Sequence, residues 1–407
     1  MKRMILTLAA ALMSTAAVAQ TPAEEAGKPE EGYLFTIEKE LKVTPVKNQN
    51  SSGTCWDYAG TAFLEAELLR MGKGEYDLSE MFTAYHDYCD RAMASIRKRG
   101  DISYSQGGCF GDVLHVMERY GLVPEEQMRP GVTHRDSLAV FGEMSSMTNP
   151  LVKAASGNGS LQADSNYQLL AMKAIRAVLQ VYLGIPPEKF TYRGRDYTPA
   201  SFRDALGLKA SDYVQVTAVL HEPLYGAFAP ESPDNWRNEP AYNVTLDELI
   251  EITDLALAQG YPVGWDSDVS EPGWRLGIKK GFVVLPANGD NNLPQGTDME
   301  HWAGKSAKQM QEEAAAHPTP QRWVTPEERQ LAWDNHETND DHLMLIYGTA
   351  KDQMGNPYYM VKNSWGRYGE YNGMFYCSKA YFRYKTITVL LHKDALSKAM
   401  KKKLDIK

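Results

Sequence analysis

The sequence predicts an α+β fold in which a helical half precedes a half rich in strands. Apolar side chains three and four positions apart over residues 59–69 predict an amphipathic helix that begins at Cys55 and ends at Gly72. In the second half, short apolar and aromatic runs predict strands at 262–269, 281–285, 342–348 and 358–362. The 407-residue chain shows no internal repeat and is long enough for one large domain or two.

The remaining elements follow in chain order. A second helix is expected over 78–97 with Ser79 as its N-cap, and a third over 111–120, closed by Gly121. Residues 126–215 contain a helical run at 171–179 among many glycines and prolines, and residues 286–338 are polar, with a helix-like stretch at 305–316. The strands 342–348 and 358–362 are expected to pair across a turn at 352–356.

The N-terminus has the pattern of a targeting segment. Lys2 and Arg3 precede an apolar run, and Ala17-Val18-Ala19 forms a cleavage site before Gln20. We expect residues 1–19 to be a signal peptide and 20–31 a flexible leader, so that the mature protein is exported, either periplasmic or extracellular. The alternative is a membrane anchor, but the run is shorter than the roughly 20 apolar residues that a span needs.

Charge argues against a nucleic-acid partner. Without residues 1–19 the chain carries 41 basic and 52 acidic side chains, a net charge of −11. A surface of that sign repels a phosphate backbone, so binding of nucleic acid is not expected.

Cys55 has the surroundings of a nucleophile. A loop of small residues precedes it and a helix opens at it, and the backbone N–H groups and dipole of a helix N-terminus favour the thiolate. Downstream the chain offers His342 and then Asn363. Cysteine, histidine and asparagine, in this order, are the parts of a cysteine acyl-transfer site.

Residues 44–56 and 363–366 resemble the cysteine and asparagine blocks of papain-like cysteine peptidases. In that family a glutamine six positions before the cysteine supplies an oxyanion-hole donor, which corresponds to Gln49. A tryptophan two positions after the asparagine shields the His–Asn hydrogen bond, which corresponds to Trp365. The resemblance implies a papain-like fold with a helical lobe and a β-rich lobe.

Departures from the usual pattern indicate one branch of that family. Ser52 stands where the usual signature has a cysteine, and 287 positions separate Cys55 from His342, whereas the usual pattern has about 130–150. With the Gly107-Gly108 pair before the helix at 111–120, this resembles the bleomycin hydrolase / aminopeptidase C branch. The resemblance implies one peptidase domain over 32–407, with large insertions at about 126–215 and 286–338.

The implied chemistry is peptide hydrolysis. Cys55 thiolate, paired with His342 imidazolium, would attack the scissile carbonyl, and His342 would protonate the leaving amine. Asn363 would orient His342, and Gln49 would stabilise the oxyanion together with the Cys55 backbone N–H. The substrates would be peptides, which Gly107, Gly108 and Trp365 are expected to contact, and no cofactor or metal is needed.

Three functions remain open at this point. The branch favours an aminopeptidase; an ordinary papain-like endopeptidase and a catalytically silent binding or assembly protein on the same fold are the alternatives. Within the branch, subunits form a homo-hexamer and the chain's own C-terminal carboxylate receives the substrate amine. Residues 396–407 are compatible with that tail, and a frayed, lysine-rich end is the alternative reading.

Several side chains near these motifs have ambiguous roles. Asp340 and Asp341 could act on His342, although a solvated loop pair is the favoured interpretation. The strand residues Trp265, Asp266 and Asp268 fit either a pocket lining or packing at a strand end. Of the four cysteines, Cys89 and Cys109 could form a disulfide, but buried free thiols are favoured; the other two are Cys55 and Cys377.

Overall fold

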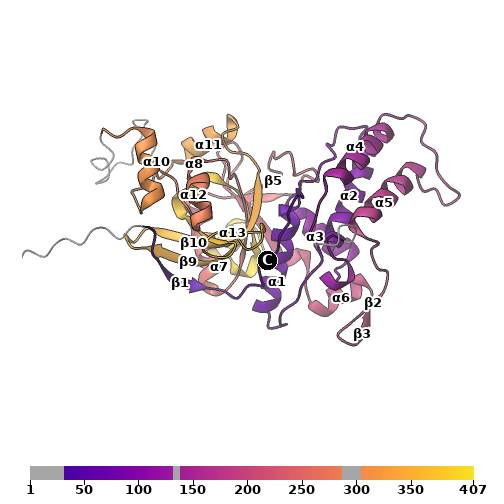
Figure 1. The fold of residues 1–407 in the computed structure, drawn as a ribbon, viewed down its shortest axis with the longest axis horizontal. Coiled ribbons are helices and arrows are strands. Elements are labelled where there is room, and N and C mark those ends of the chain that lie inside the picture. Colours follow the sequence, from indigo (N-terminus) through magenta and orange to yellow (C-terminus); the bar gives the residue numbers. More distant parts are fainter. Residues whose placement is uncertain (1–31, 132–137, 287–303) are drawn as a thin grey trace, which may run out of the picture. The chain divides into compact units, whose positions relative to one another are not determined.

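The computed structural model describes residues 32–131, 138–286 and 304–407. They belong to one compact unit, Gly32–Lys407. The expected signal peptide and leader, and short parts of both expected insertions, lie outside the described residues. The architecture is the mixed α and β arrangement that the sequence predicted, with helices on one side of a large sheet and further helices on its other side (Figure 1).

The first half of the chain forms the helical lobe. Its central helix, α1, runs through the interior, and Gly60 is required where α1 meets α3, because a Cβ there would lie 2.5 Å from Val113. A short hairpin of β2 (Phe190–Tyr192) and β3 (Arg195–Tyr197) lies at its edge. The helices of this lobe are α1 (Cys55–Arg70), α2 (Glu80–Arg97), α3 (Phe110–Tyr120), α4 (Gly142–Ser156), α5 (Leu170–Leu183) and α6 (Pro199–Leu206).

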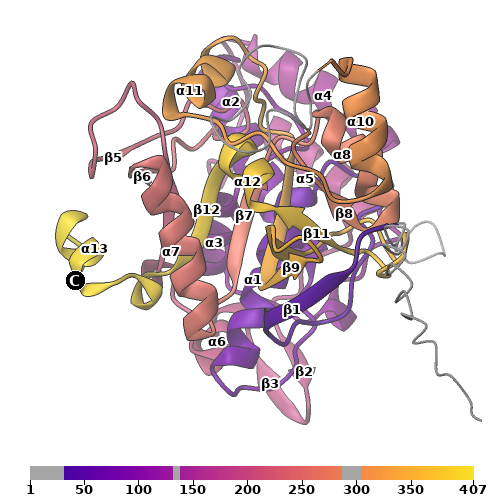
Figure 2. The ribbon, with the colours of Figure 1, turned by 90° about the vertical axis from the view of Figure 1, so that its left-hand side faces the viewer.

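The second half forms a mostly antiparallel ten-stranded sheet in the order β5-β6-β4-β12-β7-β9-β10-β11-β8, with β1 pairing β9 (Figure 2). The central strands β12, β7 and β9 are almost wholly buried, as their apolar sequences require. The strands are β1 (Phe35–Glu40), β4 (Tyr213–Thr217), β5 (Ala227–Phe228), β6 (Ala241–Asn243), β7 (Val263–Ser267), β8 (Phe282–Val283), β9 (His342–Asp352), β10 (Pro357–Lys362), β11 (Met374–Ser378) and β12 (Thr386–His392).

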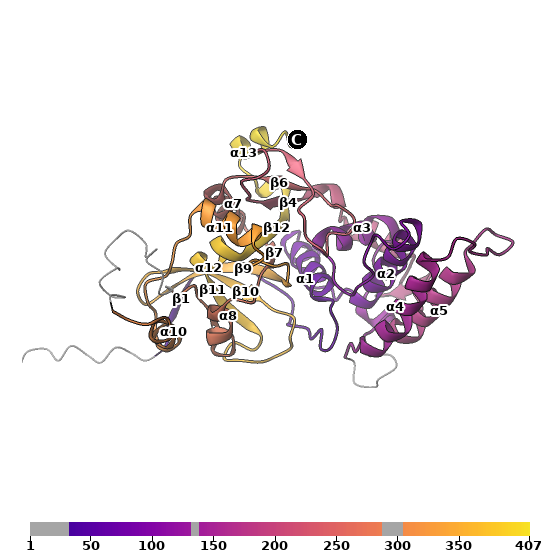
Figure 3. The same ribbon diagram turned by 90° about the horizontal axis from the view of Figure 1, so that it is seen from above.

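The sheet separates two hydrophobic cores. Leu343, Leu345 and Leu390 on its inner face pack with the helical lobe, while Met344 and Ile346 point to the outer face. This alternation is the two-residue period of a strand. The outer face is covered mainly by α7, α12 and the C-terminal segment (Figure 3). The helices of this half are α7 (Leu246–Gln259), α8 (Pro272–Gly277), α10 (Ala307–Ala316), α11 (Pro326–Asp334), α12 (Lys379–Lys385) and α13 (Lys398–Lys403).

The predicted elements are present with small shifts at their ends. Ser79 accepts a hydrogen bond from the Phe82 backbone N–H as an N-cap, so α2 begins at Glu80 and not at Leu78, which instead bridges to Pro124. The strand expected at 281–285 is reduced to β8. The proposed bounds of the two insertions stay predictions. Among the residues that the structure describes, no helix combines the length and apolar character that a membrane span requires.

Candidate active site

Cys55 is the first residue of α1 and lies at the boundary between the helical lobe and the sheet. Its side chain is half-buried against the inner-face core. The backbone amides of Trp56 and of Leu343, the residue after His342, act on the thiol as hydrogen-bond donors. The start of β9 is therefore directly beside the sulfur, although 287 positions separate the two residues in the chain.

His342 and Asn363 meet at the ends of adjacent strands. His342 begins β9, Asn363 follows β10, and their side chains are joined by a 2.7 Å hydrogen bond between Nε2 and Oδ1. This bond fixes the ring and leaves Nδ1 as the ring nitrogen available to a thiol. Trp365 stacks on the imidazole with a 4.6 Å separation of ring centroids, and Trp274 approaches it edge-on.

Gln49 is held by the same segment that carries Asn363. Its backbone N–H donates to the Ser364 carbonyl at 2.7 Å, and its side-chain Oε1 accepts from Ser364 Oγ at 2.6 Å. Nε2 donates to the Ser52 carbonyl at 2.9 Å. A primary amide has two N–H groups, so one donor of Gln49 is left for an oxyanion. The structure thus brings Cys55, His342, Asn363 and Gln49 together, and their individual catalytic roles stay predictions.

Burial controls the charges of the central pair. It raises the pKa of Cys55 to about 12, with a smaller contribution from Asp340 and Asp266, while the two backbone amides act in the opposite direction. It also lowers the pKa of His342 to about 4. The backbone amides at the helix N-terminus favour the thiolate, as expected, but burial has the larger effect. A thiolate at Cys55 or an imidazolium at His342 is each unfavourable alone in this buried setting. We therefore infer that the two charges form together, by proton transfer from Cys55 Sγ to His342, so that their attraction offsets the cost of desolvation.

The Gly107-Gly108 pair is closely packed. A Cβ on Gly108 would lie 2.9 Å from both Trp56 and Asp112, so this position requires glycine for packing alone. A Cβ on Gly107 would overlap the carboxylate of Asp234. The space beside Gly107, where a substrate backbone was expected, is thus shared with an acidic side chain from elsewhere in the chain. Whether the pair contacts substrate stays a prediction.

Asp234 belongs to a loop that connects the two lobes. This β5–β6 loop (residues 229–240) leaves the sheet, and its Ser232 donates a short hydrogen bond to Asp340. Farther along, Arg237 donates to Asp112 on α3 at 2.7 Å and to Asp87 on α2 at 2.9 Å. The loop is therefore anchored at one end to Asp340, close to His342, and at the other to the helical lobe near Gly107.

The C-terminal segment lies elsewhere. Met400 and Leu404 are buried in the outer-face core, and Lys403 pairs with Glu248 on α7. Cys55 packs on the inner face, so the sheet separates the two. The expectation that this chain's own tail lies beside the nucleophile is therefore wrong for this structure; the apolar residues Met400 and Leu404 anchor the tail to α7 instead.

The structure shows the positions of the aspartates and of Trp265, whose roles were ambiguous from the sequence. Trp265 is buried on the outer face, and Asp268 forms a fully buried ion pair with Lys385 at 3.2 Å, so both pack structurally. Asp266 lies on the inner face beside Leu343, its partner in the β7–β9 register. Asp340, expected to be solvated, is half-buried and bonded to Ser232, whereas Asp341 is exposed. All four cysteines are free, which confirms the favoured interpretation for Cys89 and Cys109.

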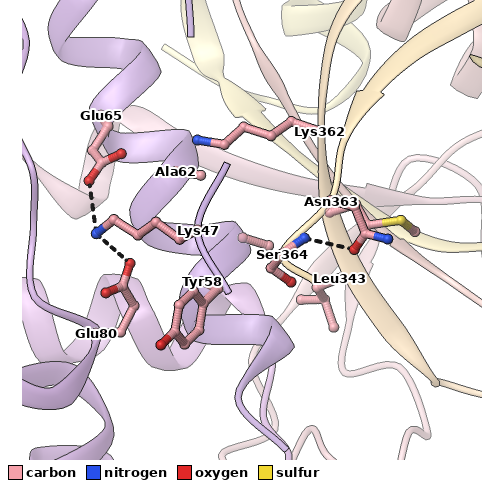
Figure 4. Close-up of a pocket in the computed structure, with 11 residues that line it drawn as sticks. Lys47, Tyr58, Ala62, Glu65, Glu80, Leu343, Lys362, Asn363 and Ser364 are labelled. Carbon is pink, nitrogen blue, oxygen red and sulfur yellow. Dashed lines mark hydrogen bonds and ion pairs between the residues drawn. The ribbon is translucent and has the colours of Figure 1, made fainter. Parts of the chain in front are cut away.

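A buried charged network behind the site was not predicted. Lys47 Nζ lies 2.8 Å from Glu80 and 3.5 Å from Glu65, two carboxylates that are almost wholly buried on α2 and α1 (Figure 4). Lys362 on β10 donates to Thr44 at 2.8 Å. Thr44 in turn donates to Glu65 at 2.5 Å. The network therefore joins the segment leading to Gln49 with the strand leading to Asn363.

Lys47→Met is expected to lower the free energy of unfolding by about 3–5 kcal/mol at pH 7, because it leaves buried carboxylates without their counter-charge. Asp77, at 2.7 Å, adds to this demand, whereas Glu125, at 3.4 Å, does not at pH 7, because burial raises its pKa to about 9 and it is protonated. Burial also raises the pKa of Glu65, and Lys47→Met removes the charge that opposes this rise, so Glu65 binds its proton more tightly in the folded variant. The deficit should therefore shrink as the pH falls from 7 toward 5.

Urea unfolding followed by circular dichroism at pH 7 and pH 5 measures this effect. Lys351→Met is the matched control, since Lys351 forms an exposed pair with Glu38 and should contribute about 0–1 kcal/mol. A loss for Lys47→Met no larger than that of the control would show that the network does not stabilise the fold.

Comparisons with known proteins agree with the geometry. The Peptidase C1-like family matches residues 3–218 and 328–407. Aminopeptidase C of Streptococcus thermophilus is 24% identical, with 90% of this chain and 84% of that protein covered. Cysteine proteinase 1, mitochondrial, of Saccharomyces cerevisiae is 23% identical, with 92% and 80% covered. The crystal structure of PepW from Lactobacillus rhamnosis HN001 has a TM-score of 0.65 at 20% identity and covers 91% of this chain and 84% of that one.

The fold and the assembled cysteine, histidine and asparagine define a cysteine peptidase with a papain-like fold. The family match covers well over half of the chain, at both the cysteine and the histidine–asparagine ends. This protein belongs to the Peptidase C1-like family.

Proposed function

We propose that this protein is an aminopeptidase of the bleomycin hydrolase type, which removes residues from the free N-terminus of peptides. The proposal is supported by the Cys55, His342 and Asn363 arrangement and by relatives named Aminopeptidase C that match along most of the chain. Cys55 attacks the scissile carbonyl, His342 protonates the leaving amine, and water then releases the acyl group from the sulfur.

The observation that favours exopeptidase over endopeptidase action is the β5–β6 loop. An endopeptidase must accommodate chain on both sides of the scissile bond. Here the loop bridges Asp340 on the sheet side and Asp112 on the helical side, and Asp234 lies against Gly107. This leaves little room for a polypeptide that continues past that point, so a substrate that ends there is preferred.

The test compares two fluorogenic amino acid amides that differ only in an acetyl group on the α-amine. We expect kcat/KM to be at least about tenfold higher for the free amine, since the acetyl group removes a charge and adds bulk at the closed end. Cys55→Ala protein serves as the blank. Equal rates for the two compounds, both dependent on Cys55, would identify an endopeptidase; no Cys55-dependent hydrolysis of any peptide would favour the silent binding protein.

We also propose that the protein is exported after removal of residues 1–19. Lys2 and Arg3, the apolar run and the Ala17-Val18-Ala19 site support this. N-terminal sequencing of protein purified from its native host is expected to begin at Gln20 or within a few residues of it. A cytoplasmic protein that retains Met1 would contradict the proposal.

Assembly into a homo-hexamer stays a proposal that rests on the branch resemblance alone. Sedimentation equilibrium distinguishes it from a monomer of about 45.6 kDa.

A further inference from the structure

Two carboxylates flank the reacting groups but take no part in the chemistry described above. Asp266 on β7 is in register next to Leu343, and Asp340 precedes His342 by two residues. Both lie near enough to Cys55 for their negative charges to raise the pKa of its thiol. Together with Ser232 of the β5–β6 loop they line one small cavity.

These carboxylates lack a cationic partner in the part of the chain that the structure describes. Asp340 accepts from the Ser232 hydroxyl, and Asp266 Oδ2 is 3.5 Å from the Thr388 hydroxyl. Asp266 is only 3% exposed; no N–H or neutral O–H of the described residues reaches its Oδ1, and its carboxyl group is hydrogen-bonded to that of Asp340. Two carboxyl groups in such contact hold a proton between them, and a bound cation could take the place of that proton.

Asp268, two positions farther along the same segment, is a buried carboxylate with a structural role and serves as a comparison. It is also buried, but it is neutralised by Lys385 at 3.2 Å. Burial and the charge of Asp340 raise the pKa of Asp266 well above its usual range, and burial raises that of Asp340 to about 6. A positive group placed between Asp266 and Asp340 would offset the repulsion that Lys385 offsets at Asp268.

The space beside the two carboxylates limits the size of that positive group. Asp266, Asp340, Ser232 and Thr388 line a cavity of about 10 Å³, which is room for one water-sized group. An ammonium group has that size, whereas a guanidinium or a further amino acid residue is too large. The β5–β6 loop residues Pro230 and Asn235 also line this cavity.

We propose that Asp266 and Asp340 bind the N-terminal α-ammonium of the peptide substrate while its first carbonyl lies at Cys55. The proposal deepens the aminopeptidase function and rests on it. It replaces the C-terminal carboxylate, which lies across the sheet, with two side chains carried by the sheet itself. Because the cavity ends at the loop, one residue is released per cleavage.

The experiment measures the ratio of kcat/KM for the free and N-acetylated amino acid amides in wild type, Asp266→Asn, Asp340→Asn and the control Asp341→Asn. Asp341 is an exposed carboxylate next to His342 and does not line the cavity, so Asp341→Asn measures the effect of losing a nearby negative charge alone. We expect the ratio to fall about 10- to 100-fold in Asp266→Asn and Asp340→Asn, through a higher KM for the free amine, and to stay near wild type in Asp341→Asn.

Two further measurements keep the result independent of turnover and of folding. In Cys55→Ala protein, leucinamide binding by calorimetry should weaken at least tenfold when Asp266→Asn is added. The melting temperature of Asp266→Asn should stay near that of wild type, because the amide replaces a carboxyl group that favours its protonated form and shares a proton with Asp340; a markedly lower stability would instead indicate a structural role.

The outcomes separate the two proposals. Wild-type protein with no preference for the free amine would overturn the aminopeptidase function and this inference with it. A wild-type preference that persists in both Asp266→Asn and Asp340→Asn would overturn only the ammonium site and leave the aminopeptidase function standing.

Discussion

Replacing Cys55 by alanine is expected to lower kcat/KM for peptide hydrolysis at least about 10⁴-fold while the protein stays folded. In the proposed mechanism the Cys55 sulfur forms the bond to the substrate carbonyl. The side chain is half-buried at the start of α1, so removing one sulfur atom leaves only a small cavity. Fluorogenic peptide hydrolysis and circular dichroism measure the two properties.

Cys377→Ala is the matched control for this change. Cys377 is a free, buried thiol in the outer-face core, across the sheet from the site. Its removal should cost some stability and leave the rate per folded molecule unchanged. Activity of Cys55→Ala within tenfold of wild type would contradict the nucleophile assignment and, with it, the enzymatic mechanism.

Replacing His342 by alanine is expected to have nearly as large an effect, about 10³- to 10⁴-fold on kcat/KM. Burial raises the pKa of the Cys55 thiol to about 12, so almost no thiolate forms at pH 7 unless a base accepts its proton. His342 is the proposed base, and burial lowers its pKa to about 4, which keeps the imidazole neutral until the transfer. The acid limb of the wild-type kcat/KM profile for the N-acetylated substrate should therefore lie near pH 4.

Asn363→Ala should cost less, about 10- to 100-fold. It removes the acceptor for Nε2, but Trp365 remains stacked on the ring and still limits its rotation. Asn335→Ala, on an exposed residue at the end of α11, is the control and should match wild type. An Asn363→Ala protein that is folded and as inactive as Cys55→Ala would show that the asparagine does more than orient the histidine.

The elements that the sequence predicted well are those defined by short-range patterns. The stripe at 59–69 places α1, and Ser79 caps α2. The site residues Cys55, His342, Asn363 and Gln49 lie in two blocks with fixed local spacing. Those blocks pair through backbone hydrogen bonds between 47–49 and 364–366, so recognising them placed the centre of the site.

What the sequence could not predict depends on contacts between distant segments. A two-residue period would place Asp266 and Asp268 on one face if the strand continued, but β7 ends at Ser267, and only the structure shows that Lys385 pairs with Asp268 and not with Asp266. The tail at 396–407 has no pattern that selects the outer face. Likewise, no local sequence pattern in the β5–β6 loop predicts that Arg237 forms ion pairs with residues of α2 and α3.

The distance along the chain between the halves of the site has a consequence for biosynthesis. Cys55 leaves the ribosome early, whereas His342 and Asn363 come after most of the sequence. The strand β1 can pair only after its partner β9 has been synthesised. A nascent chain consequently holds a thiol without a base, and hydrolysis can begin only when nearly the whole polypeptide has been made and folded. The cell that synthesises this peptidase is thereby shielded from its activity until translation is almost complete.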